Sequence, residues 1–338
     1  MMREALFYEK SVDKTVYCHL CAHECIIKNN KFGICGVRVN SKGTLFTYSY
    51  GNAIAVNVDP IEKKPLYHFL SGSESLSMAS AGCNFRCSFC QNWEISQSQS
   101  QGSISLVEDE FSPEDIVEEA LRNNCRSISY TYTEPTIFFE YAYDTSRLAK
   151  SRSLRNVFIT NGYMSGDCLK EISSYLDAAN VDLKFFREDS YRKYCAASLS
   201  PVLETIRLMK ELGIWVEITT LVIPGINDSE GELRELAGFI SGLDKNIPWH
   251  LSRFHPDYKL KNYPLTPEAT LKEALRIGRE SGLKFVYAGN VYGWGSDTIC
   301  PSCEKPLIKR DGFKVKEYNI NMGKCSYCQS TIPGVFVS

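Results

Sequence analysis

The cysteines of this chain are clustered, and this clustering restricts the possible folds because closely spaced thiols must meet around a common partner. The chain has 338 residues and 14 cysteines. Disulfide frameworks are typical of short secreted domains, whereas this chain is long and lacks an apolar run near its N-terminus that could serve as a signal peptide. We therefore expect metal binding. Cys125, Cys168 and Cys195 stand alone and are expected to be small buried side chains. The other eleven form three groups: Cys18, Cys21, Cys25 and Cys35; Cys83, Cys87 and Cys90; and Cys300, Cys303, Cys325 and Cys328.

The middle group has the spacing of an incomplete iron–sulfur ligand set. In Cys83-Asn-Phe-Arg-Cys87-Ser-Phe-Cys90, three thiolates can hold three irons of one [4Fe–4S] cluster, whereas such clusters commonly have four cysteine ligands. The fourth iron would then be open to a substrate or a cofactor. A zinc knuckle or a fortuitous cysteine cluster is the alternative, because short motifs also occur by chance.

Residues 71–295 alternate strand-like and helix-like sequence. Ser112-Pro113 and Thr266-Pro267 each place a capping side chain before a proline, which predicts that a helix begins at each site. Strands that alternate with helices predict an α/β fold with parallel pairing, and six such units indicate a partial (β/α)6 TIM-like barrel. A closed eight-unit barrel is the alternative. The predicted strands cover residues 76–81, 127–133, 156–160, 179–183, 215–223 and 248–254, with a further one at 284–288.

The two ends of the chain are predicted to be separate modules. Residues 1–70 carry the first cysteine group and short β-like runs, so we expect an N-terminal Cys-rich β segment. This group could bind zinc or an auxiliary iron–sulfur cluster, with His19 and His23 as further potential ligands, or could remain unmetallated. Residues 296–338 hold two CxxC pairs and are predicted to form a zinc-ribbon-like module, with rubredoxin-like iron as the alternative.

Polar residues follow the predicted strands of the middle segment. In parallel α/β barrels the active site lies at the C-terminal ends of the strands. The loop with Cys83, Cys87 and Cys90 follows the first predicted strand, so we expect one shared site at this end. The residues that follow the second to sixth strands are Glu134, Asn161, Lys184, Asn227 and His255.

This cysteine loop resembles the signature of the radical S-adenosylmethionine (SAM) superfamily. The resemblance implies that SAM completes the fourth iron, and that an electron from the cluster cleaves SAM to methionine and a 5′-deoxyadenosyl radical that abstracts hydrogen. It also implies that Phe89 touches adenine. Tyr132-Thr133-Glu134-Pro135 stands where the family usually has Gly-Gly-Glu-Pro, which implies that Thr133 and Glu134 bind the SAM ammonium group. The alternative is that Glu134 only begins a helix.

The later strand ends look like those of the pyruvate formate-lyase activating enzyme group. The resemblance implies that Asn161, Asp182 and Lys184 approach the ribose and carboxylate of SAM, although Lys184 is equally well explained as an exposed lysine. It assigns the turn containing Pro224, Gly225 and Asn227 to the adenine, although a Pro-Gly turn also has a plain backbone explanation. His255 would contact SAM or lie near the substrate.

A wider pattern is similar to one subgroup over nearly the whole chain. The first cysteine group, Asp59-Pro-Ile-Glu-Lys-Lys-Pro-Leu, residues 82–97 and the terminal cysteine pairs resemble the radical SAM enzyme of the AmmeMemoRadiSam system. The resemblance implies companions related to Memo and to the AMMECR family. It also implies an electron donor such as flavodoxin or ferredoxin.

Composition narrows the expected partners and functions. The net charge is −2 and acids and bases are well mixed, so we expect no nucleic-acid partner. No apolar run is long enough for a membrane span, so we expect a cytoplasmic protein without a membrane partner. The leading hypothesis is an oxidoreductase that cleaves SAM and abstracts hydrogen from a protein or peptide. The alternatives are a glycyl-radical enzyme activase and a metal-binding scaffold without catalysis.

Overall fold

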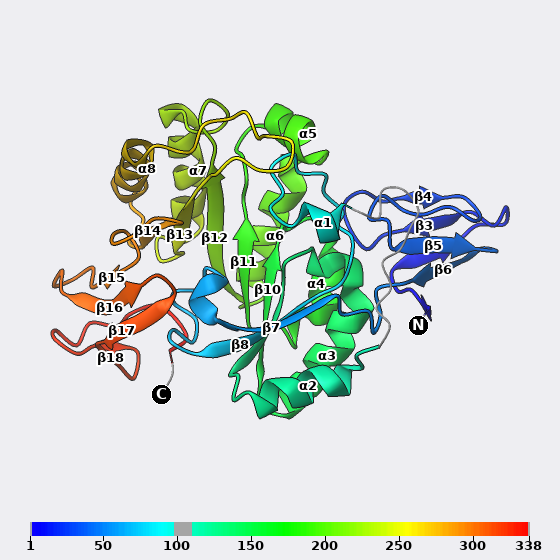
Figure 1. Cartoon of the computed structure of the whole chain (residues 1–338), viewed down its shortest axis with the longest axis horizontal. Helices are drawn as coiled ribbons and strands as arrows, with labels where there is room; N and C mark the ends of the chain where they lie inside the picture. Colours follow the sequence, from blue (N-terminus) through cyan, green and yellow to red (C-terminus); the bar gives the residue numbers. More distant parts are fainter. Residues whose placement is uncertain (1, 98–109, 337–338) are drawn as a thin grey trace.

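An eight-stranded sheet forms the centre of this computed structural model, which describes residues 2–97 and 110–336. The strand order is β14-β13-β12-β11-β10-β9-β8-β7 (Figure 1). Strands β8 to β14 pair in parallel, and β7 pairs antiparallel with β8 at one edge. The bounds are β7 (Ala55–Pro60), β8 (Glu74–Ala79), β9 (Ser127–Tyr130), β10 (Arg155–Thr160), β11 (Ala178–Asp182), β12 (Trp215–Val222), β13 (Trp249–Arg253) and β14 (Val286–Gly289).

Each connection between successive parallel strands contains at least one helix, as the alternating pattern predicted. Helices α2, α3 and α8 pack on the strands they connect, and α6 packs on β12. The α/β class and the parallel sheet are therefore confirmed, while the partial barrel stays a prediction. The bounds are η1 (Ile61–Lys63), α1 (Trp93–Ser96), α2 (Pro113–Arg122), η3 (Pro135–Phe138), α3 (Phe139–Ser151), α4 (Gly166–Ser173), α5 (Glu188–Cys195), α6 (Leu199–Glu211), α7 (Glu230–Leu243) and α8 (Glu268–Glu280).

Of the two predicted helix caps, one is confirmed and one is wrong. Ser112 caps α2, since its hydroxyl accepts from Asp115 N at 3.1 Å and the Asp115 carboxylate accepts from Ser112 N at 2.8 Å. Thr266 does not cap α8, because Pro267 occupies the N-cap position. Instead, the Thr266 hydroxyl accepts from Phe254 N at 3.0 Å and donates to Val222 O at 2.7 Å, which ties together the ends of β12 and β13.

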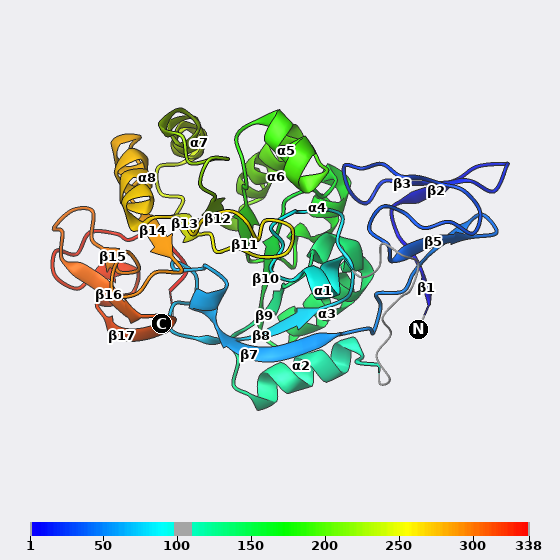
Figure 2. The same ribbon diagram turned by 45° about the horizontal axis from the view of Figure 1, so that its top comes forward.

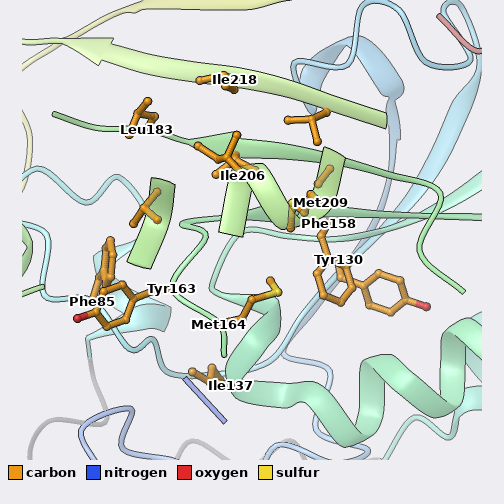
Figure 3. Close-up of a cluster of buried hydrophobic side chains, with 14 of the residues drawn as sticks. Phe85, Tyr130, Ile137, Phe158, Tyr163, Met164, Leu183, Ile206, Met209 and Ile218 are labelled. Carbon is orange, nitrogen blue, oxygen red and sulfur yellow. The ribbon is translucent and has the colours of Figure 1, made fainter. Parts of the chain in front are cut away.

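The core lies between the sheet and its helices, and it also anchors the cysteine loop. Figure 3 shows part of it, including strand residues Tyr130 and Phe158 beside helix residues Ile206 and Met209. All four residues of β9 are buried, as expected for a parallel strand covered on both faces. Phe85 of the cysteine loop is buried edge-on against Tyr163, with ring centroids 5.1 Å apart. The loop is thereby fixed to the core.

Two small β modules lie at opposite ends of the molecule (Figures 1 and 2). β7 belongs to the residues that we grouped with the N-terminal segment, but it joins the central sheet. None of the described helices is long and apolar enough to cross a membrane. The N-terminal strands are β1 (Arg3–Glu4), β2 (Tyr8–Lys10), β3 (Val16–Cys18), β4 (Ile26–Ile27), β5 (Arg38–Ser41) and β6 (Thr44–Thr47), and the C-terminal strands are β15 (Thr298–Ile299), β16 (Pro306–Asp311), β17 (Lys314–Tyr318), β18 (Ile320–Asn321) and β19 (Lys324–Cys325).

Candidate active site

A cavity of about 550 Å³ lies beside the cysteine loop and the C-terminal ends of the parallel strands. The loop follows β8 and leads into α1, which marks its place in Figure 2. Residues from β10, β12 and β13 also line the cavity, namely Ile159, Thr219 and Ser252. The structure thus brings together most of the residues predicted to hold the cluster and SAM. Those that line the cavity are Cys83, Cys87, Phe89, Cys90, Thr133, Glu134, Asn161, Asp182 and Lys184.

Backbone hydrogen bonds hold the cysteine loop against the end of α5. Arg86 N donates to Cys195 O and Ser88 N donates to Tyr194 O, both at 2.8 Å. The Sγ atom of Cys195 lies 3.6 Å from that of Cys87. Cys195 is buried as expected, but the sequence held no sign of its contact with Cys87. Contacts of this kind join segments that are far apart in the chain.

The thiols of the loop lie in surroundings that favour their protonated forms when no metal is bound. Burial raises the pKa of Cys83 and Cys90, and the hydrogen-bonding contact with Cys195 raises the pKa of Cys87. A metal ligand must be a thiolate, so iron binding would release protons here.

Glu134 both begins a helix and borders the cavity. It is the N-cap of η3, and its Oε1 atom accepts from Thr136 N at 3.0 Å and from the Thr160 hydroxyl at 2.8 Å. Its Oε2 atom accepts from Asn161 N at 2.8 Å. Burial raises the pKa of this carboxyl. The helix-capping role that was the alternative for Glu134 is therefore present, and the side chain also holds the end of β10 in place.

Lys184 carries a half-buried positive charge close to the cysteine loop. Its Nζ atom lies 2.9 Å from Asp182 Oδ2 and 5.7 Å from the centre of the Phe89 ring. Burial alone would lower the pKa of Lys184, but Asp182 and the nearby Cys87 raise it overall. Lys184 therefore stays charged and can attract a carboxylate.

Four predicted residues lie outside the cavity lining. Asn227 is buried and holds its own turn, because its amide donates to Lys184 O and Leu221 O at 2.8 Å. Gly225 has a φ of +72°, so the turn needs glycine for backbone reasons. Pro224 belongs to the same turn. His255 is exposed and lies at the rim of the cavity, because its Nε2 atom is 2.8 Å from Nε2 of Gln91, a residue that lines the cavity.

Several residues at the cavity were not predicted as site residues. Lys64 forms a buried ion pair of 2.7 Å with Asp59, and the Tyr132 hydroxyl donates to Asp59 at 2.5 Å. Burial lowers the pKa of Lys64 to about 8. In the sequence, the motif with Asp59 and Lys64 contributes to a family resemblance but carries no sign of a place at the cavity. Phe313, from the turn between β16 and β17, also reaches the cavity, and no local signal could have shown this.

Two buried polar atoms near the cysteine loop have no hydrogen-bond partner among the described residues. They are Thr219 Oγ1, whose residue lines the cavity, and Asn84 Nδ2 in the loop itself. Leaving a buried polar atom unpaired is costly, so a polar ligand in this cavity would offer a partner to Thr219 Oγ1. Three thiols beside such a cavity fit a cluster with one open iron and a polar molecule bound to it.

The C-terminal cysteines form a compact group. The ligand atoms of Cys300, Cys303, Cys325 and Cys328 all lie within 4.8 Å of one another. Tyr327 N donates to Cys325 Sγ at 3.4 Å, as expected for a turn that presents a thiolate. Sulfur atoms this close can share one tetrahedral ion. The N-terminal cysteines Cys18, Cys21, Cys25 and Cys35 line a second, enclosed space away from this group.

The chain is similar to a known protein family and to several known proteins. The model of the Radical SAM superfamily matches residues 78–237. An uncharacterized protein of Methanocaldococcus jannaschii is 47% identical over 335 residues, which cover 98% of this chain and 99% of that protein. The pyruvate formate-lyase-activating enzyme of Clostridium pasteurianum is 22% identical over 202 residues, covering 54% of this chain and 80% of the enzyme.

A solved structure shows a similar fold. The radical SAM methyltransferase from Sphaerobacter thermophilus has a TM-score of 0.51 and is 17% identical, covering 70% of this chain and 71% of that chain. The matched family segment begins within β8 and contains the cysteine loop and the strand ends from Thr133 to Lys184. The cavity is therefore built largely from the residues that the family model covers, and this part of the chain is a radical SAM domain, a family that implies a [4Fe–4S] cluster and SAM as cofactors.

Proposed function

We propose that this protein is a radical SAM enzyme that abstracts hydrogen from a protein or peptide. The observation that carries the proposal is the position of Cys83, Cys87 and Cys90 at one cavity with the strand-end residues. When bound, the cluster and SAM supply a 5′-deoxyadenosyl radical that removes hydrogen from a substrate. The roles of the individual side chains follow from their contacts.

Cys83, Cys87 and Cys90 would hold three irons, and the neighbouring polar groups would orient SAM. Oε2 of Glu134 accepts from Asn161 N and keeps capacity to accept from an ammonium group, since a carboxylate oxygen can take more than one hydrogen bond. Thr133 lines the cavity beside Glu134. Lys184 would attract the SAM carboxylate, and Phe89 would contact the adenine. Fixing SAM in this way favours productive cleavage, because the reacting atoms are held in place.

A protein or peptide substrate is supported by the activating enzymes among the relatives. Pyruvate formate-lyase-activating enzymes of Clostridium pasteurianum and Staphylococcus epidermidis are each 22% identical to this chain over parts of it. Their names state that they act on an enzyme. Activation of a glycyl-radical enzyme is therefore the narrower form of this proposal.

The remaining assignments rest on the resemblance and on the chemistry of the residues. We propose zinc at Cys300, Cys303, Cys325 and Cys328, because four close thiolates suit it. We also propose a partial (β/α)6 barrel, a cytoplasmic location, a ferredoxin or flavodoxin as electron donor, and companions related to Memo and AMMECR.

Anaerobic reconstitution tests the assignment of the cysteines. We expect a [4Fe–4S] spectrum that changes when SAM is added, since SAM would occupy the open iron. Replacing Cys83, Cys87 and Cys90 together with alanine should remove the SAM-dependent change, whereas Cys125→Ala, at a lone buried cysteine, should keep it. A SAM-dependent change that persists in the triple variant would refute the assignment.

Isotope transfer tests the substrate class. With the right protein partner labelled with deuterium, the label should appear in 5′-deoxyadenosine. Transfer from a single glycine would support the activase form, and transfer only from a small molecule would contradict a protein or peptide substrate.

A further inference from the structure

The four N-terminal cysteines surround an enclosed space. Cys18, Cys21 and Cys35 are buried and Cys25 is half-buried, and all four line the space together with apolar side chains such as Ile27. The backbone is built around them, because Cys18 N donates to Cys25 O at 2.9 Å and Glu24 N donates to Cys21 O at 3.1 Å. Four thiols in an apolar enclosure form a complete ligand set for a metal centre.

The spacing of these sulfur atoms favours a cluster over a single ion. The sulfur atoms of the four C-terminal cysteines all lie within 4.8 Å of one another, and among the described residues no other group of three or more potential metal ligands is as compact. The N-terminal cysteines do not meet this limit, and neither do Cys83, Cys87 and Cys90. Thiolates that share one zinc ion must lie close together, whereas the ligands of a cluster bind different irons and lie further apart.

Of the two nearby histidines, His23 lines the enclosed space and His19 does not. His23 Nε2 is engaged, because it donates to Asn84 O at 2.7 Å. The four sulfur atoms alone already form a complete cysteine ligand set for a cluster.

A buried cation faces the group. Arg38 is 1% exposed, donates to Leu6 O at 2.9 Å and lies with Nη1 3.7 Å from Cys18 Sγ. Its Nη2 atom is paired with the Glu140 carboxylate of α3. The charge of Arg38 is matched by Glu140, so Arg38 acts on the group mainly as a donor directed at Cys18 Sγ. A hydrogen bond to a ligand sulfur is also one of the factors that set the reduction potential of a cluster.

The N-terminal group contacts the Cys83 loop directly. His23 donates to Asn84 O, and the Arg86 guanidinium donates to Ile34 O, one residue before Cys35. Gly82 packs so closely that an added Cβ would lie 2.8 Å from Cys35 O. The backbones next to Cys35 and Cys83 therefore touch, and an electron could pass between centres at the two loops over a short path.

We propose that Cys18, Cys21, Cys25 and Cys35 hold a second iron–sulfur cluster that passes electrons to the centre at Cys83, Cys87 and Cys90. One electron from a reduced ferredoxin or flavodoxin reduces the second cluster. When this electron passes on, the second cluster is oxidised again and the centre at the cavity is reduced. No bond is formed or broken and no proton is transferred. The transfer step rests on the proposed function, whereas the binding of the second cluster does not.

Metal analysis of two variants tests the second cluster. The protein in which Cys83, Cys87 and Cys90 are alanine should keep about half of the wild-type iron and sulfide, with a signal that SAM does not change. The protein in which Cys18 and Cys21 are alanine should lose the other half and keep the SAM-sensitive signal. Cys125→Ala should keep all the iron.

Zinc content serves as the check on folding, because the C-terminal cysteines are unchanged in each variant. If the protein in which Cys18 and Cys21 are alanine loses this zinc as well, the Cys35→Ser protein takes its place in the test, since this substitution removes one sulfur with little change in volume. Zinc in place of iron at the N-terminal group, or no metal there in a folded protein, would overturn the proposal.

Comparison of two reductants tests the transfer step. Reduced ferredoxin or flavodoxin and dithionite can each drive SAM cleavage. In the Cys18 and Cys21 variant, the rate with the protein donor should fall about tenfold or more relative to the rate with dithionite. An unchanged ratio would refute the transfer step. Absence of SAM cleavage in the fully loaded wild-type protein would instead refute the proposed function, while the iron count would still decide the second cluster.

Discussion

The side-chain amide of Asn161 donates a 2.8 Å hydrogen bond to Asn84 Oδ1, which links the end of β10 to the cysteine loop. The same amide lies 3.9 Å from Cys83 Sγ, and Asn161 N donates to Glu134. Glu134 is therefore connected through Asn161 to the first cysteine of the loop. A substitution at Glu134 should therefore alter the affinity for SAM.

The first prediction is that Glu134→Ala weakens SAM binding or cleavage more than it disturbs the cluster. The variant removes the acceptor for Asn161 N and for the Thr160 hydroxyl, and leaving such buried donors unpaired costs about 1–3 kcal/mol each. SAM titration of the cluster spectrum and iron content measure the two effects. Glu134→Gln is the matched control and should be less severe, because it keeps one acceptor oxygen. Loss of iron with normal SAM binding would contradict this prediction.

The second prediction concerns the close contact between Gly82 and Cys35. Gly82 has a φ of +94°, and a Cβ would lie 2.8 Å from Cys35 O and from Val37 Cγ1. Gly82→Ala should therefore lower the free energy of unfolding by more than about 1–3 kcal/mol, the cost of backbone strain alone. Gly213→Ala is the control, because Gly213 also has a positive φ of +77° but no atom within 4 Å of an added Cβ. Equal losses in urea unfolding would argue against the packing.

The third prediction is that the C-terminal cysteines stabilise their module by binding metal. Cys303→Ser or Cys328→Ser should lower the zinc content and the melting temperature and leave cluster assembly largely intact, since the unfolded chain does not hold four ligands together. Metal analysis and thermal unfolding measure these effects. Full zinc occupancy in both variants would be incompatible with the coordination.

The fourth prediction is a loss of stability in mild acid caused by His68. Its ring is fully buried, with Nδ1 donating to Pro333 O at 2.7 Å and Nε2 accepting from the Tyr287 hydroxyl at 2.6 Å. Burial lowers the pKa of His68 from 6.5 to about 4. The unfolded chain therefore takes up a proton at a higher pH than the folded chain, and stability falls as the pH decreases through this window, by up to about 3 kcal/mol.

Urea unfolding at several pH values measures this dependence. His68→Gln should be less stable at pH 7 but should depend less on pH than the wild type between about pH 6.5 and 4, because glutamine does not titrate. Parallel pH profiles of the two proteins would show that His68 is not the group responsible.

The fold was largely predictable because its elements are marked by local patterns. The apolar runs that became β8 to β14 alternate with helices, and Ser112 carries a cap signal that depends only on its neighbours. Thr266 has the same local signal, but its hydroxyl bonds to Val222 and Phe254 from the neighbouring strands, so tertiary contacts outweigh the cap.

The cavity lining was predictable where a short motif carries the chemistry or where a polar residue follows a predicted strand, as Asn161 and Lys184 do. Cys83, Cys87 and Cys90 are recognisable from spacing alone. Phe313 reaches the cavity from a turn near the C-terminus, and Cys195 meets Cys87 from the end of α5. Such positions depend on how distant segments pack, and no pattern within the segments encodes them.

The most direct test of the central claim is SAM cleavage by the reduced, fully loaded protein. The account predicts slow formation of 5′-deoxyadenosine and methionine without substrate, faster formation with the right protein partner, and none when Cys83, Cys87 and Cys90 are alanine. A protein with a complete, reduced cluster that forms neither product under any partner condition would contradict the account and favour a metal-binding scaffold.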